Sequence, residues 1–265
     1  MRYQPSQHAW FGSPLSFLRL YLYRIMKASL PHLFDWARRK DPEADPSMWS
    51  ISYVQLMNFD DMCSKKFGNQ YKGMTMRDIN AAILEEICRA HGKSYALSLN
   101  PSGLMVEAFI THAWDEPFHE FVASIKSVFQ STLRKPNLWI CAFALVQGDD
   151  DKIAEQLRVS NSASLSKSPF VKAIHKASSF VVVRNTTTDL YSRIWCVCEL
   201  IYARKYGLVP EKTHVTGPDN FSHLHTSCLD ANASVPRDKA RILKTLLLEH
   251  DHDEIDSFIQ ELSHS

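Results

Sequence analysis

The sequence predicts an α/β fold built on a doubly wound parallel sheet. From residue 104 onward, short β-rich runs alternate with segments of helical periodicity. The runs 138–146 and 179–183 are continuously apolar, as expected of strands buried on both faces of a parallel sheet. Strand and helix follow each other three times along this segment, which is the order that a doubly wound sheet requires.

The first predicted strand is the β-rich run 106–111, with the sequence VEAFIT. Asp115 and Glu116 follow it, and Pro117 falls in the first turn of the next helix. This is a good helix start, because acidic side chains there face the positive end of the helix dipole. An apolar stripe at spacings of three and four residues carries the helix to residue 129.

The second and third units follow the same pattern. The run 138–146 predicts the second strand, and a polar loop covers 147–167. Ser168 and Pro169 are the N-cap and the first residue of a short helix. The run 179–183 predicts the third strand.

The helix after the third strand carries the most informative side chains. Asp189 or Ser192 can cap it, and Gly207 ends it. The rest of the chain predicts one further strand and two closing helices, at 211–216, 238–250 and 253–262.

Three parts are expected along the chain. They are a mainly helical extension at 1–103, an α/β domain at 104–218 and a helical segment at 219–265 that completes the fold. Within the extension, apolar periodicity predicts helices over 15–40 and 76–90, and the glycine of His91-Gly92 is expected to stop the second.

The first forty residues are basic and contain a single acid, Asp35. Organelle-transit and membrane-surface segments share this pattern, and an amphipathic helix packed on the protein is the alternative. No run is long and apolar enough to span a bilayer, since basic residues interrupt 15–34. We therefore expect a cytoplasmic protein without a transmembrane segment.

Composition excludes several classes of function. A net charge of +1 gives no argument for a nucleic-acid partner. The six cysteines lack the regular spacing of a disulfide framework, which favours a reducing compartment. The absence of GxGxxG, Walker, GxSxG and HExxH motifs argues against a dehydrogenase, a nucleotide triphosphatase, a lipase and a zinc protease.

No metal site is expected. The side chains of Cys196 and Cys198, two residues apart on a predicted helix, diverge and cannot both bind one zinc ion. His223, His225 and Cys228 have ligand-like spacing, but no fourth ligand accompanies them.

Glu199 is the strongest candidate for a chemical role. It is the only carboxylate or basic side chain in IWCVCELIYA at 194–203, a helix so apolar that most of it should be covered. Trp195 precedes it by four positions and shares its face. A carboxylate beside an indole on a covered helix indicates a cleft, where burial raises the carboxyl pKa. A solvated glutamate is the alternative interpretation.

Ligands of such sheets bind outside the carboxyl ends of the strands, near the point where strand order reverses. We expect His112, Trp114 and Asp115 after the first strand, and Arg184 after the third, to join Glu199 there. For His112 the alternative is a structural bond to the backbone, and for Asp115 it is helix capping. Arg184 suits a phosphate or a nearby acid.

At these residues the chain resembles Toll/interleukin-receptor (TIR) domains. The run FITHAWD at 109–115 is similar to the family's first box. The stretch 170–200 is similar to its helix, strand, loop and Trp-Cys-x-x-Glu-Leu motif, whose four named residues all occur within 195–200. Somewhat under half of the chain is covered. The loop 148–167 departs from the family, since it lacks the Arg-Asp and Pro-Gly patterns of receptor-type members.

The resemblance implies a flavodoxin-like sheet and, from the family's enzymatic members, cleavage of the nicotinamide–ribose bond of NAD by Glu199 as the catalytic carboxylate. NAD is then a substrate, and no cofactor is implied. The residues expected to bind it are His112, Trp114, Asp115, Arg184 and Trp195. Two alternatives stay open: a non-catalytic signalling module that self-associates through this domain, and a related nucleoside or deoxyribosyl transferase.

Overall fold

A computed structural model describes residues 41–157, 165–218, 220–221 and 227–263. Two sequence predictions lie outside these ranges. They concern the basic segment 1–40 with its expected helix at 15–40, and the pair His223 and His225. From Pro42 onward the chain forms one compact unit.

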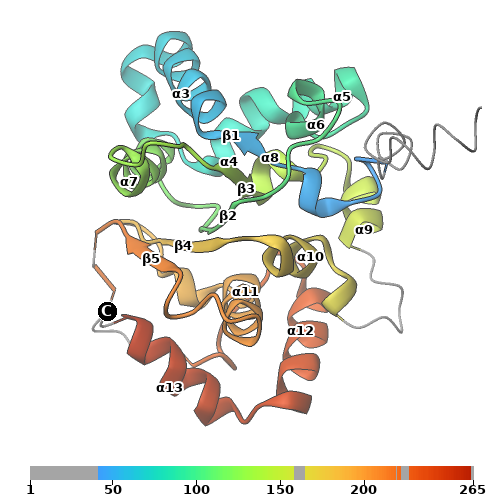
Figure 1. Ribbon diagram of the computed structural model, residues 1–265, viewed down its shortest axis with the longest axis vertical. Helices are drawn as coiled ribbons and strands as arrows, with labels where there is room; N and C mark the ends of the chain where they lie inside the picture. Colours follow the sequence, from blue (N-terminus) through green and yellow to red (C-terminus); the bar gives the residue numbers. More distant parts are fainter. Residues whose placement is uncertain (1–40, 158–164, 219, 222–226, 264–265) are drawn as a thin grey trace, which may run out of the picture. The chain divides into compact units, whose positions relative to one another are not determined.

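The described part of the chain forms an α/β fold around a five-stranded sheet, in the order β1–β3–β2–β4–β5 (Figure 1). The strands are β1 (Ile51–Ser52), β2 (Ala108–Thr111), β3 (Asn137–Ile140), β4 (Ser179–Val183) and β5 (Thr213–Thr216). β2, β3, β4 and β5 are parallel, and β1 alone runs antiparallel, pairing Ile51 with Leu138 of β3. The predicted fold class is confirmed, with a mixed but mostly parallel sheet.

Strand order reverses between β2 and β4. The chain runs from β2 outward to β3, and then returns to the other side of β2 to form β4 and β5. The chain therefore leaves β2 and β4 in opposite directions at the carboxyl edge of the sheet. In open α/β sheets this is the position at which ligands bind.

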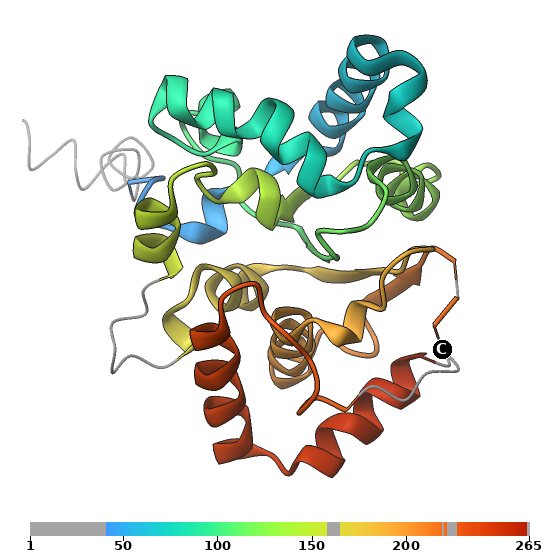
Figure 2. The same ribbon diagram turned by 180° about the vertical axis from the view of Figure 1, so that it is seen from behind.

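Helices cover both faces of the sheet (Figures 1 and 2). One layer holds α3 (Tyr53–Phe67), α4 (Met76–Ile79), α5 (Glu85–His91), α7 (Phe118–Phe129) and α8 (Cys141–Ala144). The other holds α10 (Pro169–Lys176), α11 (Ile194–Lys205), α12 (Pro236–Glu249) and α13 (His252–Ser263). The remaining described helices are α6 (Tyr95–Leu99) and α9 (Asp150–Leu157).

Alternation along the strands divides the core in two. Phe109, Trp139 and Phe180 lie side by side on the α11 face, with the Phe109 ring 4.9 Å from Trp139 and 5.5 Å from Phe180, centroid to centroid. Their neighbours Ile110 and Val181 point to the opposite face, toward α3 and α7. Aromatic side chains stacked across adjacent strands stabilise the pairing that positions the strand ends.

Two predicted elements are confirmed closely. β4 occupies the predicted 179–183. Ser168 caps α10, because its hydroxyl accepts a hydrogen bond from the Val171 backbone N–H at 3.3 Å and Pro169 is the first helical residue. Gly207, with φ of +69°, follows α11 as expected of a glycine that ends a helix.

The predicted strand 138–146 is too long. β3 ends at Ile140, and the next four residues form the short helix α8. All residues of 138–146 are buried, so the strand part and the helical part of the run are equally apolar. Hydrophobic periodicity cannot separate a buried strand from a buried helix of this kind.

The helix predicted after the first strand begins slightly later than expected, and the two acids before it do not serve its start. Pro117 is the N-cap of α7 and makes no side-chain cap, whereas Asp115 binds Arg77 and Glu116 is buried against His112. The two acids are held by side-chain contacts, of Asp115 with the distant Arg77 and of Glu116 with the nearby His112, and these take precedence over the helix dipole.

Arg193 is the N-cap of α11 and likewise provides no side-chain cap. Of the two residues expected to cap this helix, Asp189 instead caps the preceding 3-10 turn, Leu190–Ser192, and Ser192 is the last residue of that turn.

Residues 42–103 are mainly helical, as predicted, and they also supply β1 to the edge of the sheet. The helix predicted over 76–90 consists of α4 and α5 joined by a wide π turn, Asn80–Leu84, and Gly92 ends it at φ +65°. None of the helices in the described ranges has the length and apolar character needed to cross a membrane.

Candidate functional site

A cavity of about 340 Å³ lies beyond the carboxyl ends of β2 and β3 and against the first turns of α11. Four of the six residues singled out from the sequence line it: His112, Trp114, Trp195 and Glu199. The cavity therefore lies at the carboxyl edge of the sheet beside the point where strand order reverses, and the segment after β4 contributes to it through Arg193 and the first turns of α11.

Glu199 is a buried acid in the wall of this cavity. Its side chain is in the second turn of α11, and the residue is only 5% exposed. Burial raises the pKa of its carboxyl group to about 7, although the Thr111 hydroxyl and the charge of His112 act to lower it. A carboxyl group of this kind changes its charge near neutral pH.

Trp195, four residues before Glu199, is held between two neighbours. Its ring stacks on Phe170 with centroids 4.7 Å apart, and the guanidinium of Arg241 lies 5.7 Å from the ring centroid. Trp114 also lines the cavity, with the Arg77 guanidinium 6.0 Å from its ring. The two indoles give the cavity apolar walls that suit a flat, aromatic ligand.

Asp115 lies outside the cavity lining and fixes two cations that line it. Its carboxylate accepts a hydrogen bond from Arg77 Nε at 2.8 Å, and Arg193 Nη1 lies 4.0 Å away. The Arg77 hydrogen bond lowers the pKa of Asp115, so the carboxylate is charged at neutral pH. Asp115 thus positions the guanidinium groups at the side of the cavity.

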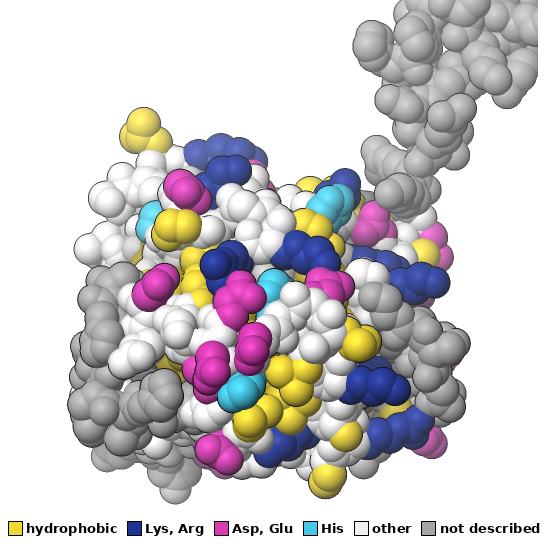
Figure 3. Space-filling view, turned by 90° about the horizontal axis from the view of Figure 1, so that it is seen from below, with side chains coloured by type: hydrophobic (Ala, Val, Ile, Leu, Met, Phe, Trp, Pro, Cys, Tyr) yellow, Lys and Arg dark blue, Asp and Glu magenta, His cyan; other side chains and the backbone are white. Residues whose placement is uncertain are grey.

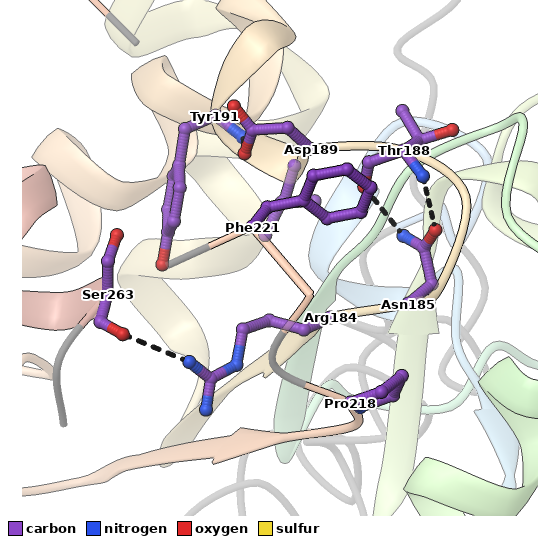
Figure 4. Close-up of a pocket in the computed structure, with 9 residues that line it drawn as sticks. Arg184, Asn185, Thr188, Asp189, Tyr191, Pro218, Phe221 and Ser263 are labelled. Atoms are coloured by element: carbon purple, nitrogen blue, oxygen red, sulfur yellow. Dashed lines mark hydrogen bonds between the residues drawn. The ribbon is translucent and has the colours of Figure 1, made fainter. Parts of the chain in front are cut away.

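Arg184 is not part of this group. Its Nη1 donates a hydrogen bond to the backbone oxygen of Ser263 at 3.1 Å, at the end of α13 (Figure 4). Arg184, Asn185 and Tyr191 line a separate pocket of only about 10 Å³. That volume suits a single water molecule, and a phosphate is too large for it.

His112 is the centre of a buried chain of three side chains. Its Nδ1 lies 2.9 Å from Oε1 of Glu116, and its Nε2 lies 3.2 Å from Sγ of Cys141. Burial opposes protonation of the ring, but Cys141 and Glu116 outweigh it and raise the pKa of His112. Burial also raises the pKa of Glu116 to about 7, despite the contact with His112.

Asn80 lines the cavity and has a buried side-chain oxygen without a hydrogen-bond partner among the described residues. It belongs to the π turn between α4 and α5, lines the cavity and is 7% exposed. Its Nδ2 donates to Glu85 Oε1 at 3.1 Å, while its Oδ1 has no hydrogen-bond partner among the described residues. Widened helical turns often occur at functional sites, and a buried orphan acceptor suits a donor group on a ligand.

Sequence reasoning missed Arg77, Asn80, Glu116, Cys141 and Arg193. Arg193 lies two residues before Trp195, the first residue of the motif, so its position was a usable signal. Arg77 and Asn80 precede β2, the first of the parallel strands, and no local pattern connects them with α11. Cys141 was hidden inside an apolar run, where cysteine is usually a small buried hydrophobe.

The surface offers one loose group of possible metal ligands among the described residues. Asp251, His252 and Asp253 have ligand atoms within 4.8 Å of one another, and all three are consecutive and largely exposed. On the face shown in Figure 3, acidic and basic side chains are interspersed. We assign no site to this group, since exposed acidic clusters are common without an ion.

Comparison of the chain with protein-family models, curated proteins and solved structures finds no match in any of the three. The chemistry of the cavity is therefore the basis on which a function can be argued.

Proposed function

We propose that the protein cleaves the nicotinamide–ribose bond of NAD, as a hydrolase or cyclase, with Glu199 as the catalytic carboxylate. The observation that carries the proposal is a glutamate only 5% exposed in the wall of a cavity of about 340 Å³. The resemblance of 109–115 and 170–200 to TIR domains supports it, since the motif glutamate of that family corresponds to Glu199.

The reaction needs a negative charge beside the ribose. As the bond between the ribose C1′ and the nicotinamide nitrogen breaks, its electron pair leaves with nicotinamide and positive charge develops on the ribose. A carboxylate in a water-poor cavity stabilises that charge strongly. Water then attacks C1′ and yields ADP-ribose, or an adenine nitrogen attacks it and yields a cyclic product.

The other residues of the cavity suit the rest of the substrate. Trp114 can stack on the nicotinamide ring, Trp195 adds apolar surface to the wall, and Arg77 and Arg193 can bind the diphosphate. The orphan Oδ1 of Asn80 can accept a hydrogen bond from the carboxamide N–H₂. Each of these groups lines the same cavity as Glu199.

The test is incubation of purified protein with NAD, followed by chromatography of the products. We expect nicotinamide together with ADP-ribose or its cyclic form. Free nucleosides tested in parallel identify a nucleoside or deoxyribosyl transferase instead. If folded protein at high concentration releases no nicotinamide and self-associates as its concentration rises in light scattering, the non-catalytic signalling module takes the place of this proposal.

Asn80→Ala is expected to raise KM for NAD about fivefold to tenfold with a smaller effect on kcat, because one hydrogen bond to the bound substrate contributes about 1 kcal/mol. Steady-state kinetics of nicotinamide release measure both constants. Asn69→Ala is the matched control, since Asn69 is exposed and outside the cavity lining. An unchanged KM in Asn80→Ala would show that this oxygen does not contact the substrate.

A further inference from the structure

We propose that Cys141, His112 and Glu116 form a second chemical centre on this cavity: a thiol nucleophile, its general base and the carboxylate that orients the base, able to take the acyl group of an ester, thioester or amide. This activity goes beyond NAD cleavage and does not depend on it.

The sheet brings the three residues together. β2 and β3 are parallel, with Ile110 opposite Ile140. Cys141 follows directly after β3, and His112 follows directly after β2. The two side chains therefore leave the sheet at the same edge, with Cys141 Sγ 3.2 Å from His112 Nε2. Sulfur and imidazole at this distance permit direct proton transfer.

Glu116 completes the order nucleophile, base, carboxylate. Its Oε1 lies 2.9 Å from His112 Nδ1, on the opposite side of the ring from Cys141. This bond directs Nε2 toward the thiol, which is the arrangement that activates a nucleophile in unrelated hydrolases. Glu116 is thus a positioning residue, and His112 is the base.

Stability does not account for this arrangement. Glu116 is completely buried, and its Oε2 has no hydrogen-bond partner among the described residues. Burying an ionisable pair with an unsatisfied oxygen is costly, and apolar side chains of similar volume serve a core at least as well. Buried ionisable groups with shifted pKa values cluster at functional sites. Two of these three side chains, His112 and Cys141, line the cavity.

Cys141 is distinguished from the other cysteines. All six lie in the described ranges and are unpaired and buried. Of the six, Cys141 and Cys196 line the cavity. The Cys196 thiol donates to the backbone oxygen of His112 at 3.4 Å, whereas the Cys141 thiol lies against the His112 ring. Cys141 is the one whose proton the imidazole can take.

The reaction has two balanced steps. The Cys141 sulfur, having passed its proton to His112, attacks the acyl carbon, and the bond from that carbon to the leaving oxygen, sulfur or nitrogen breaks. The leaving group departs with the bonding pair and takes the proton from His112. Water then gives a proton to His112 and attacks the thioester carbon, which releases the acid and returns the proton to the thiol.

The test uses the full chain and p-nitrophenyl acetate. We expect a burst of about one equivalent of p-nitrophenolate above the buffer background, and a single acetyl group that peptide mass spectrometry locates on Cys141. Equal labelling of several cysteines, or no labelling of folded protein, would overturn the proposal without any variant. Nicotinamide release is assayed separately, so failure of one activity leaves the other measurable.

Three variants separate the roles. His112→Asn is expected to slow acylation about a hundredfold. Cys228→Ser, a buried cysteine outside the cavity lining, is the matched control and should keep the wild-type rate. Circular dichroism establishes that each variant folds. A His112→Asn protein that folds and acylates at the wild-type rate would remove the base from the proposal.

Glu116→Gln tests the positioning role through the pH profile. Glu116 and Cys141 raise the pKa of His112, whose other ionisable neighbours are Cys196 and Glu199 on α11. Without the carboxylate, the rise of acylation rate with pH should move to lower pH and reach a lower plateau. A reduced plateau with an unmoved profile would show that Glu116 only supports the fold.

Discussion

Glu199→Gln is expected to lower kcat for nicotinamide release about a hundredfold to a thousandfold. The amide has nearly the volume of the carboxyl group, so the cavity keeps its shape, but it carries no charge to stabilise the oxocarbenium-like ribose. KM should change less, because the aromatic and cationic groups that line the cavity are retained. Initial rates of nicotinamide release over a range of NAD concentrations give both constants.

Glu249→Gln is the matched control for this experiment. The replacement is the same, but it is made on the surface, where the half-exposed side chain of Glu249 pairs with Lys205 at 2.6 Å. Its turnover should equal that of the wild type. Unreduced turnover in Glu199→Gln would exclude Glu199 from the mechanism, even if the protein consumes NAD.

The same substitution is expected to stabilise the fold at alkaline pH. The pKa of Glu199 is about 7 in the folded protein and 4.5 for the unperturbed group. Below pH 4.5 both states keep the proton, so burial carries no charge penalty. As pH rises from 4.5 to 7 the unfolded state loses its proton first, and above pH 7 the folded state is destabilised by about 3 kcal/mol, at about 1.4 kcal/mol per pKa unit.

Glutamine has no proton to lose, so Glu199→Gln should gain about 3 kcal/mol in free energy of unfolding at pH 8 and close to nothing at pH 4. Urea unfolding at the two pH values measures the difference. Glu249→Gln should not reproduce this dependence. Part of the wild-type pH dependence should persist in Glu199→Gln, because Glu116 also has a raised pKa. An equal effect at both pH values would show that Glu199 has the same pKa in the folded and unfolded states, so that burial does not raise it.

The sequence was most informative where local forces decide the structure. The strand 179–183 and the cap at Ser168 depend on a few adjacent residues, and both were predicted closely. The strand 138–146 was overestimated because a run of buried residues has no periodicity to mark the change from β3 to α8.

The candidate site was predictable along single elements and at the strand ends, where the rule on ligand position placed His112 and Trp114 with Glu199. Glu199 and Trp195 share one helical face, so their proximity could be inferred from spacing. Asn80 and Arg77 reach the same cavity from residues more than a hundred positions away, and this contact depends on the complete fold. Glu116 was misassigned because an acid beside a proline has the same local pattern whether it caps a helix or binds a buried histidine.

The contribution of α4 and the π turn to the cavity has a practical consequence. A truncated protein beginning at residue 104, the predicted start of the α/β domain, would lose Arg77 and Asn80 together with the edge strand β1. Its cavity would lack one side, and the aromatic core under α3 would face water. Inactivity of such a fragment would reflect this missing side and would reveal nothing about Glu199.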